Sequence, residues 1–218
     1  IKIIMHDVVT KLVLIQKEIQ QKNNQTKIIA VSKTFPMDKI MPLINHGHKD
    51  FGENKVQEAI EKWTAIKKEF TDINLHMVGK IQSNKVKYVL PLFDYIHSLD
   101  SLKLAEKIAN EQKNYNKDIK IFIQVNIGDE PQKSGISPIE IEDFKNKCIN
   151  DLKLNIIGLM CLPPKNKNAS IYFNEMNELL IKSGLKKLSM GMSQDYLEAT
   201  EHNASFVRVG SKIFGIRD

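Results

Sequence analysis

Cysteine is scarce in this 218-residue chain, which holds only Cys148 and Cys161. The two form no CxxC pair, so the sequence argues against a disulfide framework and is typical of a protein from a reducing compartment. Long apolar runs are also missing, and no stretch is long enough to cross a membrane. The hydrophobic content of 42% and the charged content of 27% are ordinary for a folded protein. We therefore expect a soluble, cytoplasmic protein.

Arginine is almost absent, although the chain is basic. Of the 32 lysine and arginine residues only Arg208 and Arg217 are arginines, and the formal net charge is +6. The lysines are spread along the whole chain, and the basic stretch GKIQSNKVKY at 79–88 holds one aromatic residue. This distribution favours a solvated surface over a nucleic-acid footprint. We expect no nucleic-acid partner, and a basic RNA-binding module stays as an alternative.

Several nucleotide and metal motifs are missing as well. The sequence holds neither the GxxxxGK(S/T) phosphate loop nor the GxGxxG fingerprint, so neither a P-loop nor a dinucleotide site is supported. The HGH triplet at 46–48 resembles a metal-binding pair, but no third ligand has a suitable spacing. We predict no metal site.

The order of the expected elements is the strongest structural signal that is present. Eight short apolar runs predict strands, at 28–33, 50–52, 74–78, 94–98, 119–126, 155–161, 187–190 and 205–209. Helical patterns lie before and between them, at 1–24, 37–46, 54–69, 82–90, 100–115, 137–148, 168–183 and 195–202. Strict alternation of strand and helix requires a parallel sheet with helical crossovers.

Eight such repeats predict a single (β/α)8 TIM-type barrel with an extra N-terminal helix, in one domain over residues 1–218. A doubly wound open sheet is the alternative, because the number of strands does not establish closure. In a barrel the functional groups gather at the carboxyl ends of the strands.

Lys33 stands at the predicted carboxyl end of the first strand, in KIIAVSKTFP. Lysine is rarely buried, because an ammonium group loses much of its hydration in an apolar site. One reading is a structural lysine paired with a carboxylate. The other is a lysine whose amine must at times be neutral in order to attack a carbonyl group.

Arg208 and two small-residue loops lie at the ends of the last two predicted strands. Arg208 provides a planar, permanently charged group, with a structural ion pair as the alternative reading. The loops are SMGMSQD, in which Ser193 is expected to cap a helix, and VGSKIFG, which holds Gly210 and Ser211. Loops at these two places often bind phosphate in barrels. Lysine, arginine and an anion site together describe a site for pyridoxal 5′-phosphate.

Seven stretches carry a family resemblance when taken together. They are AVSKTFP, DFGENKVQEA, LHMVGKIQSNKVKYV, IQVNIGDEPQKSG, GLMCLPP, LSMGMSQDYLEA and FVRVGSKIFGIR. With them the chain resembles, from about residue 28 onward, the pyridoxal-phosphate homeostasis proteins, single-domain relatives of the alanine racemase N-terminal barrel. The resemblance implies that Lys33 carries the cofactor as a Schiff base, that Arg208 faces the pyridine nitrogen and that Asn54 lies near the ring. It also implies that Ser193, Gly210 and Ser211 hold the phosphate.

The same resemblance implies that the protein buffers or delivers the cofactor in vitamin B6 homeostasis, with cofactor-accepting apo-enzymes as candidate partners. We expect no significant catalysis, because few residues follow the eighth predicted strand and no tyrosine is placed as a second base. We also expect a monomer. The enzymatic alternative is a pyridoxal-phosphate-dependent, racemase-like amino-acid enzyme.

Overall fold

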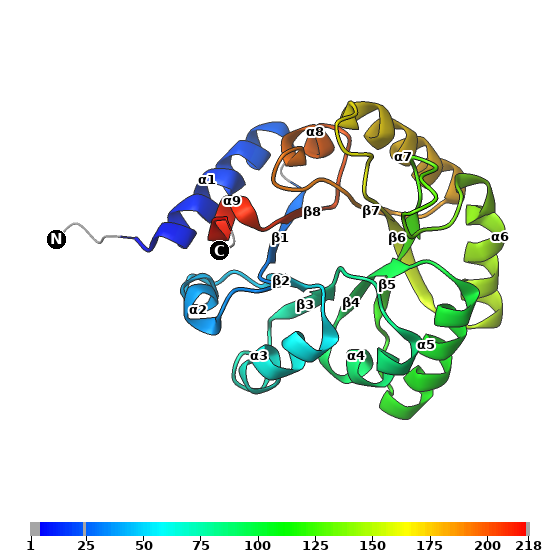
Figure 1. Ribbon diagram of the computed structural model, residues 1–218, viewed down its shortest axis with the longest axis horizontal. Coiled ribbons are helices and arrows are strands. Elements are labelled where there is room, and N and C mark those ends of the chain that lie inside the picture. Colours follow the sequence, from blue (N-terminus) through cyan, green and yellow to red (C-terminus); the bar gives the residue numbers. More distant parts are fainter. Residues whose placement is uncertain (1–4, 24, 217–218) are drawn as a thin grey trace.

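Eight parallel strands and the helices around them form the protein (Figure 1). The computed structural model describes residues 5–23 and 25–216. The strands are β1 (Lys27–Val31), β2 (Asp50–Glu53), β3 (Asn74–Met77), β4 (Tyr95–Leu99), β5 (Lys120–Val125), β6 (Asn155–Cys161), β7 (Lys187–Ser189) and β8 (Phe206–Val209). They pair in sequence order, and β8 returns to pair with β1. The predicted closed barrel is confirmed, and the open doubly wound sheet is wrong.

Helices connect the strands on the outside of the barrel. The α-helices are α1 (Asp7–Lys22), α2 (Met37–Asn45), α3 (Val56–Glu69), α4 (Val86–Leu92), α5 (Leu102–Tyr115), α6 (Ile141–Asn146), α7 (Ala169–Ser183), α8 (Tyr196–Glu201) and α9 (Ser211–Phe214). Two 3₁₀ turns, η1 (Ser83–Lys85) and η2 (Pro138–Glu140), and one π-helical stretch, η3 (Lys147–Asp151), extend them. No helix within these described residues combines the length and the apolar character needed to cross a membrane.

The expected N-terminal helix is present as α1, while residues 1–4 and 24 of its predicted range lie outside the described residues. Leu12, Ile15 and Ile19 form its buried stripe, as a 3.6-residue period requires. The helix packs against α2, α8 and α9, beside the seam where β1 meets β8 (Figure 1). It therefore braces the closure of the barrel.

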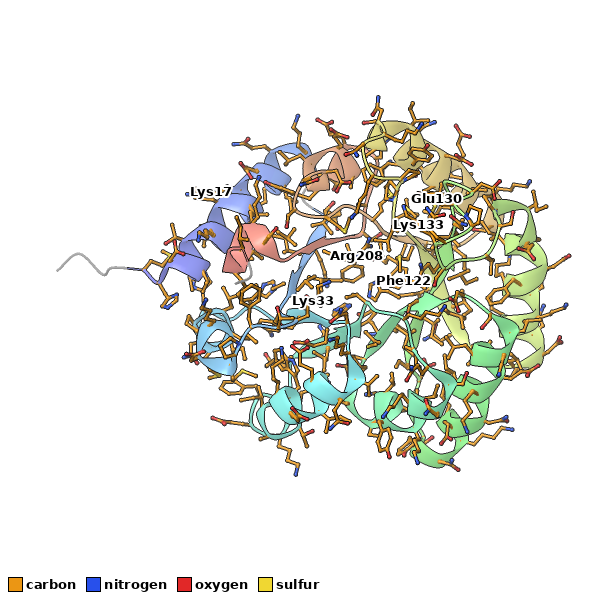
Figure 2. The ribbon with its side chains drawn as sticks, viewed as in Figure 1. Lys17, Lys33, Phe122, Glu130, Lys133 and Arg208 are labelled. Carbon is orange, nitrogen blue, oxygen red and sulfur yellow. The ribbon has the colours of Figure 1, made fainter. Side chains whose placement is uncertain are left out.

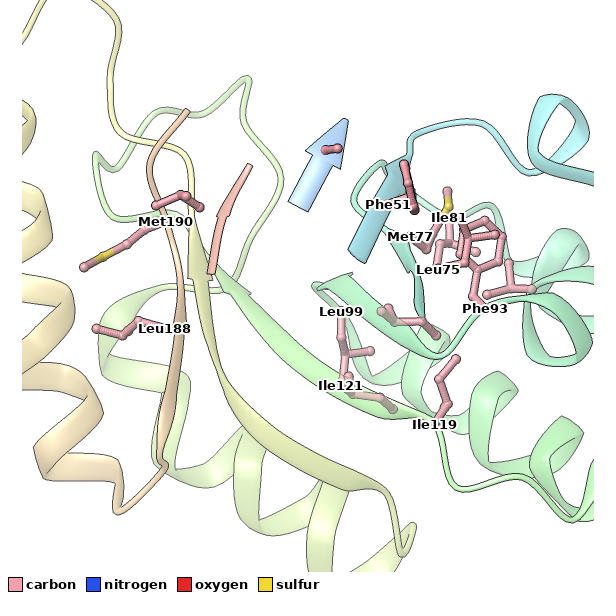
Figure 3. Packing of buried hydrophobic residues seen from close by; sticks show 14 of the residues in the cluster. Phe51, Leu75, Met77, Ile81, Phe93, Leu99, Ile119, Ile121, Leu188 and Met190 are labelled. Carbon is pink, nitrogen blue, oxygen red and sulfur yellow. The ribbon is translucent and has the colours of Figure 1, made fainter. Parts of the chain in front are cut away.

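The core has two parts because the strands are apolar on both faces. Residues on the outer face pack against the helices, and Figure 3 shows part of this layer, including Phe51, Leu75 and Met77. A smaller apolar cluster lies inside the barrel and consists of Ile29, Val31, Tyr95, Phe122, Met160 and Phe206. The interior is thus a packed core, and functional groups must emerge at its ends.

The structure differs from the sequence prediction at three elements. The first strand ends at Val31 rather than at residue 33, because the chain turns sharply after Ser32. The helix expected at 137–148 begins after a Ser137 cap but continues as η2, α6 and η3 in turn. The short helix α9 was not predicted, since four residues are too few to show a helical period.

Candidate functional site

The pairing of β1 with β8 brings the first and last parts of the predicted site together. Ile29 is opposite Arg208, and Ala30 is opposite Val209. A Cβ atom at Gly210 would lie 3.2 Å from the carbonyl oxygen of Val31, so the backbones that follow the two strands are in close contact. Figure 2 shows the labelled Lys33 and Arg208 side chains toward the centre of the ring of helices.

Lys33 lies two residues beyond the end of β1, in a tight turn, and its side chain is half-buried. The next residue, Thr34, has a φ of 68°, a left-handed conformation that is unfavourable for a β-branched residue. Its backbone N–H donates to Oε1 of Glu58 on α3. The turn therefore holds a strained backbone directly after Lys33, and such strain persists only where surrounding contacts fix it.

Lys62 of α3 supplies many of those contacts. Its Nζ donates to the carbonyl oxygens of Ser32, at 2.8 Å, and Phe35, at 3.3 Å, which lie on either side of Lys33 in the chain. The same ammonium group pairs with Oε1 of the fully buried Glu53 at 2.7 Å and with Oε1 of Glu58 at 2.9 Å. Lys62 thus ties the turn to helix α3.

Glu53 is the buried anchor of this arrangement. Its Oε1 also accepts hydrogen bonds from the Ser32 hydroxyl, at 2.7 Å, and from the indole N–H of Trp63, at 3.0 Å. Its Oε2 is buried and has no hydrogen-bond partner among the described residues. We assigned no role to Glu53 or Lys62 from the sequence, and the available signal was a glutamate at the carboxyl end of the short strand run DFGE.

Arg208 is 5% exposed and extends into the barrel. Its Nη1 donates to Oγ of Ser189 at 2.7 Å, and its Nη2 donates to the carbonyl oxygen of Cys161 at 2.8 Å. Burial lowers the pKa of Arg208 below its ordinary value, but a guanidinium group stays cationic at neutral pH. No carboxylate within 4 Å of Arg208 is recorded for the described residues, so the ion-pair reading is not supported.

The two loops expected to bind phosphate meet at Ser193. Its hydroxyl oxygen accepts from the backbone N–H groups of Gly210, at 3.3 Å, and Lys212, at 3.4 Å. Ser211 lies between these residues, is exposed and begins α9. The expectation that Ser193 caps the next helix is wrong, because Asp195 holds that position in α8 and accepts from the N–H of Met192.

Asn54 follows β2 at the same end of the barrel. Its Oδ1 is buried and has no hydrogen-bond partner among the described residues. A Cβ atom at Gly79, after β3, would lie 2.2 Å from the carbonyl oxygen of Asn54, so only glycine fits there. This end of the barrel thus combines an unsatisfied buried acceptor, a half-buried lysine, an arginine and two backbone loops. Such a set suits a ligand that carries a hydrogen-bond donor, an aldehyde and a phosphate.

Ser189, His97 and His76 are polar groups to which we assigned no role of their own from the sequence. All three are fully buried inside the barrel, and Ser189 touches Arg208 directly. For the two histidines the available signal was polar side chains in otherwise apolar strands, at LHMV and YIHS, which we had counted only as structural elements. Ser189 begins the SMGMSQD loop, in which only Ser193 was given a role.

These features define a (β/α)8 barrel with a lysine, an arginine and the two loops that meet at Ser193 at its carboxyl end. The family model described as alanine racemase, N-terminal domain, matches residues 14–218. The chain belongs to this family.

Named relatives cover nearly the whole chain. The pyridoxal phosphate homeostasis protein of Pasteurella multocida is 34% identical over 217 residues, covering 94% of this chain and 93% of the relative. That of Aquifex aeolicus is 36% identical over 203 residues, covering 89% and 88%. The solved structure of PipY from Synechococcus elongatus with pyridoxal phosphate bound has a TM-score of 0.84 and 30% identity, covering 95% of this chain and 100% of PipY.

Proposed function

We propose that this protein binds pyridoxal 5′-phosphate through a Schiff base on Lys33 and buffers or delivers it in vitamin B6 homeostasis, without significant catalysis. The observation that carries the proposal is the β1–β8 seam, where the Lys33 turn, Arg208 and Gly210 adjoin. The names of the relatives and the PipY complex support the same cofactor.

Each candidate residue has one task in this proposal. The cofactor supplies an aldehyde, with which the Lys33 amine condenses to form a C=N bond and release water. The Ser193 hydroxyl and the backbones of Gly210 and Ser211 hold the phosphate dianion, for which backbone N–H groups are suitable donors. Asn54 accepts a hydrogen bond from the cofactor near its ring.

Arg208 is assigned to the pyridine nitrogen. A permanent cation at that position disfavours protonation of the ring and weakens it as an electron sink. The proposed cofactor is therefore held tightly but is poorly activated for amino-acid chemistry.

A racemase-like reaction would also need a second base on the opposite face of the cofactor. Tyr196 is engaged elsewhere, because its hydroxyl donates to Glu18 of α1 and accepts from Lys212. Tyr95 lies at the other end of the barrel, at the start of β4 and stacked on His76. Neither tyrosine is placed to serve as that base, which favours the carrier over the enzyme.

Borohydride reduction and mass spectrometry test the assignment. We expect the pyridoxyl adduct on the peptide that contains Lys33, and loss of the visible absorption band in Lys33→Ala. Lys39→Ala, which changes an exposed lysine in the neighbouring helix, is the matched control and should keep both signals. An adduct mainly on another lysine would overturn the role of Lys33, and salt-sensitive RNA binding without any chromophore would favour the RNA-binding alternative.

Incubation of the loaded protein with alanine and other amino acids separates carrier from enzyme. We expect no deuterium exchange or racemisation above that of free cofactor, and we expect transfer of the cofactor to an added apo-enzyme. Sustained turnover well above free cofactor would establish the racemase-like alternative.

A further inference from the structure

A chain of hydrogen bonds runs through the inside of the barrel from one end to the other. It joins Asp50, His76, His97, Ser189 and Arg208, and we call it the buried relay. Asp50 is the first residue of β2 and lies at the amino-terminal end of the barrel. Arg208 belongs to the proposed cofactor site at the other end. We propose that Asp50 is a positioning residue for Arg208 and acts on it through this relay.

The distances are those of ordinary hydrogen bonds throughout. His76 Nε2 lies 3.0 Å from Oδ1 of Asp50, and His76 Nδ1 lies 2.9 Å from Nε2 of His97. His97 Nδ1 lies 2.8 Å from Oγ of Ser189, which accepts from Nη1 of Arg208 at 2.7 Å. Four consecutive bonds thus connect the two ends of the barrel.

Each ring in the relay is also fixed by stacking. His76 lies parallel to Tyr95, with centroids 4.2 Å apart and planes 8° apart. His97 lies against Phe122 at 4.4 Å and 18°. Both histidines are fully buried, so they cannot exchange these partners for water without opening the barrel. Because stacking fixes the rings, what can still change is which ring nitrogen of each histidine carries the hydrogen.

The two ends of the relay determine those positions. A carboxylate only accepts, so His76 must carry its hydrogen on Nε2 and present Nδ1 as an acceptor. His97 must then donate from Nε2, which leaves its Nδ1 to accept from the Ser189 hydroxyl. Burial lowers the pKa of His76, although Asp50 acts to raise it, and burial together with the charge of Arg208 lowers the pKa of His97. Both shifts favour neutral rings, as the order of donors and acceptors requires. One order of donors and acceptors satisfies every bond.

This order leaves the Ser189 oxygen free to accept from Arg208. If Asp50 were replaced by an apolar residue, His76 could move its hydrogen to Nδ1, and His97 would have to do the same. His97 Nδ1 would then donate to Ser189, and the Ser189 hydroxyl hydrogen would lose its acceptor and could turn toward the guanidinium. Asp50 thus keeps the Ser189 hydrogen directed at His97 and away from Arg208, although Asp50 and Arg208 lie at opposite ends of the barrel.

Histidine tautomers can be measured on the cofactor-free protein by long-range ¹H–¹⁵N correlation spectra. In the wild type we expect both His76 and His97 to be neutral with hydrogen on Nε2. Asp50→Asn keeps an acceptor oxygen and should preserve both tautomers, whereas Asp50→Leu should move hydrogen to Nδ1 in both rings. A wild-type spectrum with hydrogen on Nδ1 of either ring would overturn the proposal without any variant.

Asp94 provides a matched control. It precedes β4 at the same end of the barrel and binds Lys67 and the N–H of Leu75, but it does not belong to the buried relay. Asp94→Leu should lower stability while leaving the wild-type tautomers and cofactor dissociation rate unchanged. If it changed the tautomers as Asp50→Leu does, the effect would be general loosening of the barrel end and the proposal would fail.

The effect on Arg208 rests on the proposed function and is measured separately, as the dissociation rate of pyridoxal phosphate. We expect Ser189→Ala and Asp50→Leu each to raise the rate by about fivefold, the effect of one ordinary hydrogen bond. In the double variant Asp50→Leu should add no further increase, because its route to Arg208 is already broken. Additive effects would overturn the proposal. Absence of binding in the wild type would instead refute the proposed function, while the tautomers would still decide on the relay.

Discussion

Replacing Lys62 with methionine should strongly destabilise the protein. Lys62 pairs with Glu53, whose side chain is fully buried, and is itself only 13% exposed. Removing the ammonium group breaks the ion pair of a buried carboxylate, which typically costs about 3–5 kcal/mol. It also frees the carbonyl groups of Ser32 and Phe35 from their shared donor. Since the free energy of unfolding of such domains is only about 5–15 kcal/mol, Lys62→Met should lower the urea midpoint markedly.

Two further variants show whether the buried charge is the cause. Adding Glu53→Gln to Lys62→Met should recover about half of the loss, because a neutral amide oxygen still accepts from Trp63 and Ser32. Lys11→Met breaks an exposed pair with Asp7 and should cost less than about 1 kcal/mol. The urea unfolding curve, followed by circular dichroism, measures all three. If Lys62→Met cost no more than Lys11→Met, our account of the turn that carries Lys33 would be wrong.

Three other predictions follow from single contacts. Gly79→Ala should reduce the affinity for pyridoxal phosphate by about tenfold or more, because the new Cβ atom would displace the backbone of Asn54. Fluorescence titration measures this affinity, and an unchanged value would contradict the prediction. Burial raises the pKa of Cys148 to about 11 and that of Cys161 to about 12. At about pH 8 both thiols should therefore react with Ellman's reagent only after denaturation, and rapid reaction of the native protein would disprove this prediction. Burial acts to raise the pKa of Asp94, but hydrogen bonds and charge from Lys67 outweigh it and lower that pKa below 3.8. This carboxylate therefore stabilises the fold above about pH 4 and loses that contribution as the pH falls further, so acidification should lower the urea midpoint less in Asp94→Asn than in the wild type.

The barrel could be predicted because its signal repeats. Alternation of apolar runs with helical patterns gave each of the eight strands within a few residues, and alternation alone requires a parallel sheet. Closure was predicted from the number of repeats alone, and the pairing of β1 with β8 is what establishes it. The helix at 137–148 was predicted as one piece because a change from 3₁₀ to π geometry alters hydrogen bonding without changing the apolar pattern much.

The candidate site was predictable where residue type and position at a strand end mark a residue, and unpredictable where the role of a residue depends on its partners. Lys33 and Arg208 stand out by type and place, and the structure brings both to the same end of the barrel. The role expected for Ser193 as a helix cap was wrong, because its partners are the amides of Gly210 and Lys212, distant in the sequence. Lys62 was not found at all, since an amphipathic helix with a lysine on it is unremarkable until the helix is packed.

The seam between β1 and β8 also fixes when the site can form as the chain is made. Lys33 leaves the ribosome early, whereas Arg208 follows roughly ten to thirty seconds later at a rate of about 5–20 residues per second. Until then one edge of β1 stays unpaired, because β8, its partner there, lies near the other end of the sequence. The nascent chain therefore exposes Lys33, the proposed cofactor lysine, before Arg208 and the two loops of the proposed site have been made. Selective binding at the proposed site therefore requires the finished barrel. A ligand that contacts both β1 and β8 cannot guide the early steps of barrel folding.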